Sequence, residues 1–410
     1  MSSTTEIVVV VGAGHAGAEV VATLRQNAYE GRIILIGDEP ELPYRRPPLS
    51  KTYLSGEATR ESLLIRSAAA YDKLQVECWI GTQVLDIDRV KKSVLLSDGR
   101  VQPYTKLVLA TGGRPRRLTD PEAQKPNVHY IRTLADIDQL QPGFTRGKSL
   151  LVIGGGYIGL EAAAVGIKSG LAVTVLEAAP RLLARVAAPE ISAFYEGAHR
   201  RRGVDVRTRV SVQAFHGDQQ VQSVTLSDGS VLEVDLIIVG IGIVPNDELA
   251  RSAGLDVDNG IVVDSYAQTM DPDILAVGDC AQHFNGFLAR LLRIESVPSA
   301  QEQGRTAALA ICGKAVAHAA VPWFWSDQFD LKLQMVGLNP GYDQLVLRGD
   351  PLTESFTAFY LKQGIVLSVD AVNRPQDFMV AKRLVAERLV VDPLVLADES
   401  VSLKSLLPVS

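Results

Sequence analysis

Two glycine-rich segments have the residue types and spacing of phosphate-binding turns. The first places Gly12, Gly14 and Gly17 directly after the β-branched run at residues 7–11. In such a turn the first glycine permits a tight bend, the second lets a pyrophosphate approach the backbone, and the third allows close packing of helix on strand. A helix that begins there adds amide donors and the positive end of its dipole. The segment is therefore predicted to bind a dinucleotide.

The second segment repeats this chemistry in the middle of the chain. Gly154, Gly156 and Gly159 follow another apolar run, and Glu177 ends the next one. A carboxylate at the end of that strand accepts hydrogen bonds from a ribose 2′-hydroxyl and repels a 2′-phosphate. This pattern predicts a second dinucleotide site, one that prefers NADH to NADPH.

Charged residues near each turn refine these assignments. At the end of the strand that follows the first turn and its helix, Asp38 is the expected ligand of the adenosine ribose, and Glu39 is a neighbouring candidate. After the second turn, Arg181 and Arg185 leave the alternative of NADPH open, since a nearby arginine can pair with a phosphate.

A third signal lies later in the chain, where Gly278 and Asp279 follow the apolar run at residues 274–277. An aspartate in this position is by itself most often a turn residue or a helix cap. Next to two dinucleotide motifs, we interpret Asp279 as the ligand of the ribityl chain of FAD. The cofactors expected are therefore FAD and NADH.

The elements that must position these residues follow a repeated strand–turn–helix–strand order. Strands are expected at 7–11 and 33–36 around the first turn, and at 150–153 and 173–176 around the second. Runs of β-branched residues indicate parallel strands that are covered on both faces. Two such units in one chain predict two doubly wound α/β domains.

The chain is expected to cross between these domains twice. Strand-like runs at 106–109 and 236–240 lead into the turn-rich segments ATGGRP and IGIVPN, and a helix is predicted over 299–311. From Trp323 the pattern changes to alternating strands with a helix near 379–388. The predicted domains are an FAD-binding domain at 1–115 and 246–322, an NAD-binding domain at 116–245, and a C-terminal α+β domain at 323–410.

Composition narrows the class of protein. The chain has 410 residues and a net charge of −6, so nothing indicates a nucleic-acid partner. Its three cysteines form no CxxC pair and no cluster with histidine that would suggest a metal, which indicates a reducing compartment. The apolar run near the N-terminus is too short for a signal peptide or a membrane span. We expect a cytoplasmic protein without metal or membrane partner.

Taken together, the motifs resemble the FAD-dependent NADH:ferredoxin reductases of bacterial oxygenase systems, the family of the putidaredoxin and biphenyl-dioxygenase reductases. The resemblance covers nearly the whole chain, and its segments are VVGAGHAG, LPYRRPPLSK, ATGGRPRRL, VIGGGYIGLEAA, VGIGIVPN, ILAVGDCA and PWFWSDQFDLKLQ. The glutathione reductase family and apoptosis-inducing factor are more distantly similar. The fold implied is glutathione-reductase-like: two interleaved Rossmann-like domains plus a C-terminal α+β domain.

This resemblance implies roles for further residues. Lys51 is expected beside the flavin, paired with Glu161, and Trp325 over the flavin or at the docking surface. Val297 is expected to offer its amide near the flavin pyrimidine, at the start of a helix that points its positive end at the flavin. The remaining cofactor contacts implied for the two dinucleotides are His15, Ala16, Arg46, Val84, Ala110, Thr111, Gly112, Arg132, Tyr157, Ile158, Arg185 and Gly242.

The function implied is electron transfer from NADH, through FAD, to a small acidic [2Fe-2S] ferredoxin that serves a P450 or a ring-hydroxylating oxygenase. Two alternatives remain open: an NADH-dependent disulfide- or peroxide-reducing flavoenzyme, and an NADH-sensing flavoprotein. The first is disfavoured because residues 15–51, where its redox cysteine would lie, contain no cysteine. The basic residues expected to dock the ferredoxin are Arg66, Arg290, Arg293, Lys382 and Arg383.

Overall fold

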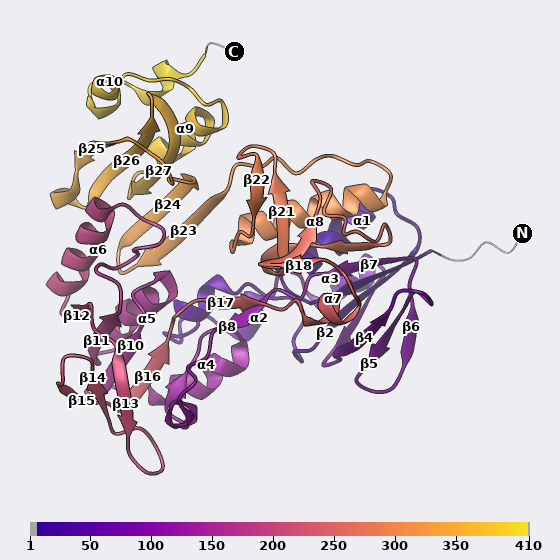
Figure 1. The fold of residues 1–410 in the computed structure, drawn as a ribbon, viewed down its shortest axis with the longest axis horizontal. Coiled ribbons are helices and arrows are strands. Elements are labelled where there is room, and N and C mark those ends of the chain that lie inside the picture. The colour runs from indigo at the N-terminus through magenta and orange to yellow at the C-terminus, as the bar shows by residue number, and fades with distance from the viewer. Residues whose placement is uncertain (1–5, 409–410) are drawn as a thin grey trace, which may run out of the picture. The chain divides into compact units, whose positions relative to one another are not determined.

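The computed structural model describes residues 6–408, and Figure 1 shows their fold. The expectation about a leader at the N-terminus therefore falls partly on residues 1–5, which lie outside the described residues. The chain forms two compact units. The first comprises residues up to Arg45, Glu61–Arg114 and Val244–Phe324; the second comprises Arg46–Arg60, Pro115–Ile243 and residues from Trp325 onward. The first unit is thus interrupted by the second, as an interleaved two-domain architecture requires.

The first unit is organised around a five-stranded parallel sheet. Its strands, in spatial order, are β20 (Ile274–Ala276), β7 (Lys106–Leu109), β1 (Ile7–Val11), β2 (Arg32–Gly37) and β3 (Val76–Ile80). The central strands are almost fully buried, which explains their continuous β-branched sequences. Strand order reverses between β1 and β7, and ligands of doubly wound sheets bind at such a reversal.

Helices and small antiparallel sheets complete the first unit. Helices α1 (His15–Gln26) and α8 (Val297–Ile311) pack side by side (Figure 1). The shorter helices are α2 (Arg60–Leu63), whose first residue belongs to the second unit, α3 (Ala68–Lys73) and α7 (Glu248–Ser252). One small antiparallel sheet joins β4 (Val84–Asp88), β5 (Ser93–Leu96) and β6 (Val101–Pro103). A second small sheet joins β18 (Val257–Asp258), β19 (Gly260–Val263), β21 (Ala281–Asn285) and β22 (Arg290–Leu292). In the second sheet β19 and β21 run parallel and the other neighbours antiparallel.

The second unit contains a second parallel sheet of five strands. Their spatial order is β12 (Asp205–Thr208), β11 (Ala172–Glu177), β10 (Ser149–Ile153), β16 (Leu236–Val239) and β9 (Val128–His129). Its helices are α4 (Leu134–Leu140), α5 (Tyr157–Lys168) and α6 (Pro189–Arg201). An antiparallel sheet joins β13 (Val212–His216), β14 (Ser223–Leu226) and β15 (Val231–Glu233). The crossovers between the units are the paired short strands β8 (Gly113–Pro115) and β17 (Ile243–Pro245).

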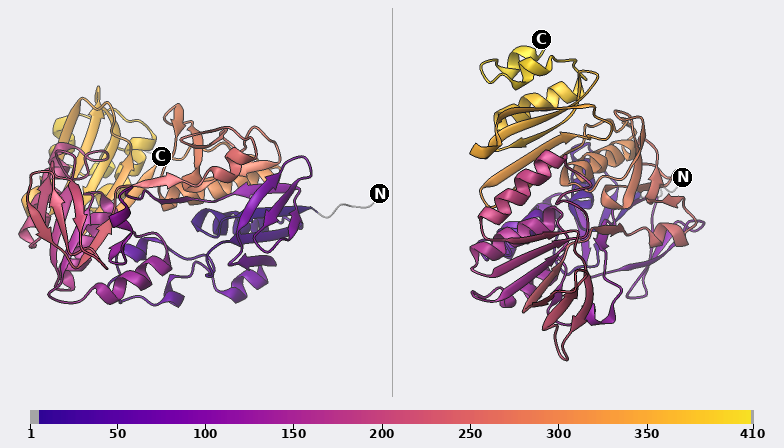
Figure 2. Two further views of the ribbon diagram at one scale, coloured as in Figure 1. Left: turned by 60° about the horizontal axis from the view of Figure 1, so that its bottom comes forward. Right: turned by 60° about the vertical axis from the view of Figure 1, so that its left-hand side comes forward.

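The C-terminal part of the second unit is an antiparallel sheet with helices (Figure 2). Its strands, in spatial order, are β23 (Trp323–Gln328), β24 (Leu331–Gly337), β27 (Ile365–Val372), β26 (Ser355–Lys362) and β25 (Gln344–Asp350). Helices α9 (Pro375–Ala386) and α10 (Pro393–Ala397) follow.

These elements confirm the predicted α/β fold, with differences at helix starts. Helix α8 begins at Val297, two residues before the predicted start, because the Ser296 side chain caps it by accepting from the Ser299 amide. Helix α9 begins at Pro375, well before residue 379, because proline is compatible with the first turn of a helix. No helix within residues 6–408 has both the length and the apolar character that crossing a membrane requires.

Candidate cofactor and electron-transfer site

The first glycine turn lies where the parallel sheet of the first unit reverses its strand order. Gly12 has a φ of +118°, and a Cβ at this position would lie 2.1 Å from the carbonyl oxygen of Ala110 at the end of β7. The Gly12 amide donates to the Ile36 carbonyl at 2.8 Å. Only glycine fits this approach of two backbones, so the motif holds the ends of β1, β2 and β7 together.

Helix α1 starts at this turn and is suited to bind phosphate. Gly14 is its N-cap, and among the described residues no side chain caps it. A Cβ at Gly14 would have no described atom within 4 Å, so the turn is open on the side where a Gly14 side chain would lie. At Gly17 a Cβ would lie 2.1 Å from the Gly12 carbonyl oxygen, so helix and turn touch. These features fit a pyrophosphate of FAD.

The acid after β2 is placed differently from its counterpart in the second unit. The Leu176 carbonyl accepts from the Gly154 amide of the second turn, just as the Ile36 carbonyl accepts from the Gly12 amide of the first. The position equivalent to Glu177 is therefore Gly37. A Cβ at Gly37 would lie 2.6 Å from the Ala13 Cβ, which leaves no room for a side chain there. An acid must therefore come from the following residues. Asp38 is exposed, whereas the Glu39 carboxylate accepts a hydrogen bond from the Tyr44 hydroxyl at 2.5 Å.

Other predicted FAD contacts gather around the same turn. The Gly278 φ is +80°, and a Cβ there would lie 3.1 Å from the Ala16 Cβ, which places the Asp279 turn against α1. The Gly278 amide donates to the Gln303 side chain of α8 at 2.8 Å. Val297 is the first residue of that helix, and its contact with the flavin stays a prediction.

Asn246, which was not among the predicted site residues, holds the crossover segment of the first unit in place through hydrogen bonds. Asn246 donates from its amide side chain to the Thr111 carbonyl at 2.9 Å, and its carbonyl accepts from the Thr111 hydroxyl at 2.5 Å. Its backbone amide donates to Gly112 at 2.9 Å. Val84 is buried at the start of β4, and Thr82 just before it donates to the Gly37 carbonyl at 2.8 Å. Val84 is therefore tied to the loop that carries Asp38.

The second glycine turn has the same construction in the second unit. Gly154 has a φ of +111°, and a Cβ there would lie 2.4 Å from the Gly240 carbonyl oxygen. Gly156 is the N-cap of α5 and a Cβ there would meet only that carbonyl oxygen, at 4.0 Å. Gly159 approaches Gly154 as Gly17 approaches Gly12. This turn fits a second pyrophosphate.

Glu177 ends β11 beside this turn. Its carboxylate accepts from the Gly155 amide at 2.8 Å and from the Ala179 amide at 2.7 Å. Arg181 donates to the Ala184 and Ala187 carbonyls and is thus held by its own loop. Because these bonds engage its guanidinium, Arg181 is less available to pair with a 2′-phosphate, which weakens the NADPH alternative.

Of the other residues predicted to bind NADH, Tyr157 and Ile158 begin α5, whereas Arg185 lies beside Gly242. Arg185 is exposed, and its guanidinium lies 3.5 Å from the Cβ position of Gly242. Ile158 is 42% exposed on the first turn of α5. The Tyr157 hydroxyl contacts the Met335 sulfur at 2.9 Å, so Tyr157 packs toward β24.

One turn further along α5, Glu161 forms a buried ion pair with Lys51. The Nζ–Oε2 distance is 2.8 Å, and the side chains are 17% and 1% exposed. Ser50 donates to the same carboxylate oxygen at 2.5 Å, and Ser326 donates to the other oxygen at 2.6 Å. Burial of a carboxylate is favourable only when cations and donors surround it, and these three groups supply that environment.

Arg46 and Arg132, both predicted flavin contacts, are also in contact. The Arg46 guanidinium donates to the Arg132 carbonyl at 2.6 Å. Trp325 is half-buried on β23, one residue before Ser326, so the two side chains point to opposite faces of that strand. The sequence reading missed Ser50 and Ser326. The available signal was polar residues at alternating positions, Ser326 and Gln328, within an aromatic strand.

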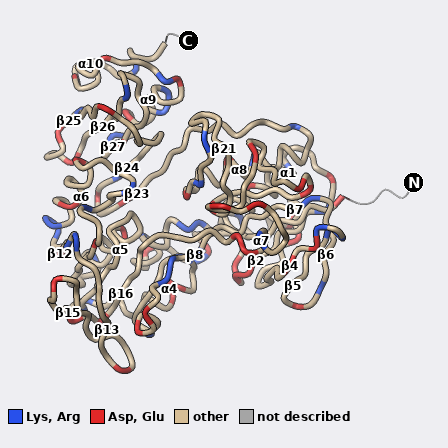
Figure 3. Tube along the Cα trace, in the orientation of Figure 1, with Lys and Arg blue, Asp and Glu red and all other residues tan. Residues whose placement is uncertain are grey.

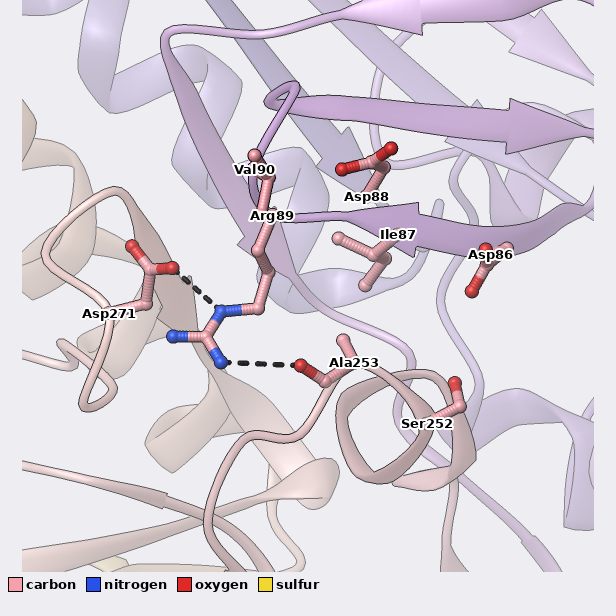
Figure 4. Close-up of a pocket in the computed structure, with 8 residues that line it drawn as sticks. All are labelled: Asp86, Ile87, Asp88, Arg89, Val90, Ser252, Ala253 and Asp271. Carbon is pink, nitrogen blue, oxygen red and sulfur yellow. Dashed lines mark hydrogen bonds and ion pairs between the residues drawn. The ribbon is translucent and has the colours of Figure 1, made fainter.

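The described residues also form a pocket of about 680 Å³ in the first unit (Figure 4). In it Arg89 pairs with Asp271 at 2.8 Å and donates to the Ala253 carbonyl at 3.3 Å. Its lining residues are Asp86, Ile87, Asp88, Arg89, Val90, Ser252, Ala253 and Asp271. None of these is a predicted cofactor contact, and the Arg89 guanidinium is already bonded to Asp271 and Ala253, so we assign the pocket no cofactor.

All three cysteines are free thiols in environments that do not favour thiolate. Burial raises the pKa of Cys78 to about 11 and also raises the pKa of Cys280 and Cys312. Cys280 is fully buried, and its sulfur faces the Val277 carbonyl at 3.3 Å. Because the thiolate is the reactive form, these environments disfavour a redox role for the three cysteines.

Turnover is therefore expected to need no cysteine. A triple Cys→Ala variant should keep its electron-transfer activity per bound FAD within a few-fold of the parent, while losing about 1–3 kcal/mol of stability through packing. Activity and FAD content of the purified variant measure this. A variant that keeps FAD and is reduced by NADH, yet cannot pass electrons onward, would show that a cysteine relays them.

Comparison with known proteins agrees with this geometry. Residues 7–304 match the family described as pyridine nucleotide-disulphide oxidoreductase, and residues 323–407 match the reductase C-terminal family. The chain therefore belongs to the pyridine nucleotide-disulphide oxidoreductase family. It is an NADH-dependent flavoprotein oxidoreductase that binds FAD and NAD(H).

Individual relatives match over nearly the full length. The chain is 49% identical to putidaredoxin reductase of Pseudomonas putida, over 98% of this chain and 96% of that protein. It is 41% identical to the ferredoxin–NAD(+) reductase component of the anthranilate 1,2-dioxygenase system of Burkholderia cepacia, over 97% and 98%. The solved covalent putidaredoxin reductase–putidaredoxin complex matches with a TM-score of 0.95 at 49% identity, covering 98% of both chains.

Proposed function

We propose that this protein transfers electrons from NADH, through FAD, to a small [2Fe-2S] ferredoxin that serves a P450 or a ring-hydroxylating oxygenase. The observation that carries the proposal is the buried Lys51–Glu161 pair, which joins the segment between the two dinucleotide turns to the first helix of the NADH turn. The names of the full-length relatives, which are ferredoxin reductases of oxygenase systems, support it.

In this proposal each part of the chain has one task. The turn at Gly12 and the Asp279 loop hold FAD, and the turn at Gly154 with Glu177 holds NADH. When bound, FAD supplies the ability to accept two electrons together and release them singly. With FAD bound, Lys51, held by Glu161, would orient the reacting face, and the start of α8 at Val297 would offer its amides and positive end to the flavin.

The proposal is tested by NADH-driven reduction of a panel of purified [2Fe-2S] ferredoxins, with cytochrome c or a P450 as the terminal acceptor. At least one ferredoxin should be reduced with turnover that depends on both FAD and NADH. Rapid reduction of disulfides or peroxide with no ferredoxin reduction would instead support the disulfide-reducing alternative.

Preference for NADH over NADPH is expected from Glu177, because its carboxylate would repel a 2′-phosphate. The kcat/KM with NADH should exceed that with NADPH by at least about tenfold, or ~1.4 kcal/mol of differential binding. Steady-state kinetics with both nucleotides measure this. Equal values would contradict the assignment of Glu177.

The basic residues predicted to dock the ferredoxin differ in their exposure and in whether they form ion pairs within the protein. Arg293 is only 9% exposed, pairs with Glu295 at 2.7 Å and donates to the Asp279 carbonyl at 3.3 Å. These contacts make it less available to a partner than the exposed candidates, and its docking role stays a prediction. Arg383 is exposed but pairs with Glu387 at 3.0 Å, whereas Arg290 is exposed on β22. Basic and acidic residues are interspersed along the whole trace (Figure 3), so a local basic patch, not net charge, must attract an acidic partner.

Ferredoxin reduction is therefore expected to weaken as salt rises. Attraction between exposed charges is screened beyond a Debye length of about 10 Å at 0.1 M salt, so the KM for ferredoxin should rise several-fold between low and physiological salt. Arg290→Ala should flatten this dependence. A KM that does not change with salt would indicate apolar docking.

We also propose a reducing, cytoplasmic compartment. Three unpaired thiols, with no disulfide among them, support this proposal.

A further inference from the structure

A buried chain of hydrogen bonds leads away from Glu161 into the C-terminal sheet. Ser326 donates to Glu161 Oε1 at 2.6 Å, and the Gln328 side-chain nitrogen donates to the Ser326 hydroxyl at 3.2 Å. The Gln328 oxygen lies 2.8 Å from His199 Nε2 on α6. Ser326, Gln328 and His199 are all 0% exposed. Segments far apart in sequence therefore converge on one carboxylate.

The donors and acceptors of this chain can be arranged in only one direction. The serine hydroxyl donates to the carboxylate, so it must accept from the Gln328 amide, which in turn leaves the Gln328 carbonyl to accept from His199. Burial lowers the pKa of His199 to about 4, which favours the neutral ring, and donation to the Gln328 carbonyl then requires the ring proton on Nε2. Its Nδ1 has no hydrogen-bond partner among the described residues. Each donor in this series of hydrogen bonds, from His199 through Gln328 to Ser326, thus points toward Glu161.

This arrangement divides the two oxygens of Glu161 between different partners. Oε2 faces Lys51 and Ser50, and Oε1 faces Ser326. Rotation about the last side-chain bond of glutamate is broad and only weakly restricted by itself. A donor fixed on Oε1 is therefore what keeps the carboxylate plane, and with it the Lys51 ammonium, in one orientation.

We propose that Ser326 is a positioning residue that orients Glu161, and through it Lys51, and that Gln328 and His199 hold the Ser326 hydroxyl in its donating orientation. This inference rests on the proposed function in that Lys51 is taken to act beside the flavin. It assigns a task in NADH oxidation to the C-terminal sheet, whose other expected role is partner docking.

The test compares Ser326→Ala with two matched variants in the FAD-bound enzyme. Ser326→Thr keeps the hydroxyl. Ser368→Ala removes another buried hydroxyl of the same sheet, one without a hydrogen-bond partner among the described residues. Flavin reduction by NADH is followed in stopped flow. Ser326→Ala should slow it about tenfold, or ~1.4 kcal/mol in the barrier, while Ser326→Thr stays within about threefold and Ser368→Ala is unchanged.

A double-mutant cycle with Glu161→Ala separates positioning from stability. If Ser326 acts through Glu161, Ser326→Ala should slow reduction by less than about twofold in the Glu161→Ala background. The unfolding midpoints of the four holoenzymes of this cycle, namely the parent, Ser326→Ala, Glu161→Ala and the double variant, give an independent readout. They should show coupling between the two residues. Wild-type reduction rates in Ser326→Ala with a lowered midpoint would overturn the proposal, as would equal slowing in both backgrounds.

Gln328→Met keeps the test decisive if Ser326→Ala does not fold. It removes both hydrogen bonds of Gln328 at similar volume and should slow reduction about threefold by releasing the Ser326 hydroxyl. Unchanged reduction in a folded Gln328→Met variant would overturn the role given to Gln328 and His199. If the parent enzyme did not oxidise NADH, that result would contradict the proposed function. The coupling in the unfolding midpoints would still show whether Ser326 contacts Glu161.

Discussion

Gly156→Val is expected to weaken NADH binding at least about 100-fold, or ~2.7 kcal/mol, while FAD stays bound. Gly156 has an extended backbone (φ −84°, ψ 177°) that valine adopts without strain, and a Cβ there would approach only the Gly240 carbonyl oxygen, at 4.0 Å. The fold should therefore tolerate the change, but the new methyl groups would fill the space that a pyrophosphate needs. Titration of the purified variant with NADH measures the loss.

Gly14→Val is the matched variant in the first unit. Gly14 is also an extended N-cap with open space at its Cβ position, so this variant should fold but lose FAD and, with it, all flavin absorbance. The two glycines thus control for each other, because the same substitution should remove a different cofactor at each site. Unchanged NADH affinity in Gly156→Val, or full FAD content in Gly14→Val, would contradict the cofactor assignment.

Breaking the Lys51–Glu161 pair is expected to slow flavin reduction by NADH at least tenfold, about 1.4 kcal/mol, with FAD retained. Lys51→Met also leaves the Glu161 carboxylate, 1% exposed, without its cation. Removing one partner of a fully buried pair costs about 3–5 kcal/mol, and the residual exposure of Lys51 lowers that to about 2–3 kcal/mol of unfolding free energy. Stopped-flow reduction and chemical denaturation measure the two effects, and Glu161→Gln should slow reduction with a smaller loss of stability.

A surface pair in the same unit provides the control. Arg60 and Asp138 join the same segment of the chain to α4, but their side chains are 48% and 35% exposed. Exposed pairs contribute about 0–1 kcal/mol, so Arg60→Ala should leave flavin reduction unchanged and stability nearly so. Parental reduction rates in both Lys51→Met and Glu161→Gln would end the proposed role of the buried pair.

The sequence by itself determined the two dinucleotide turns. Gly12 and Gly154 must adopt positive φ values beside another strand's backbone, and the apolar runs before them must be buried. These requirements are local: a glycine is needed where no Cβ fits, and a strand covered on both faces needs continuous apolar residues. The pairing of Lys51 with Glu161 was expected from family resemblance, because no local pattern connects the two positions.

The tertiary structure alone decided how charges and hydroxyl groups are used. Arg181 and Arg293 are bonded within the protein, although by sequence they were equal to the exposed Arg185 and Arg290. Ser326 lies 165 positions from Glu161 along the chain, and only the packing of a strand against α5 brings them together. Local spacing specifies backbone conformation and which faces are buried, whereas the partner of a polar side chain depends on which elements pack against each other, and residue spacing does not encode that.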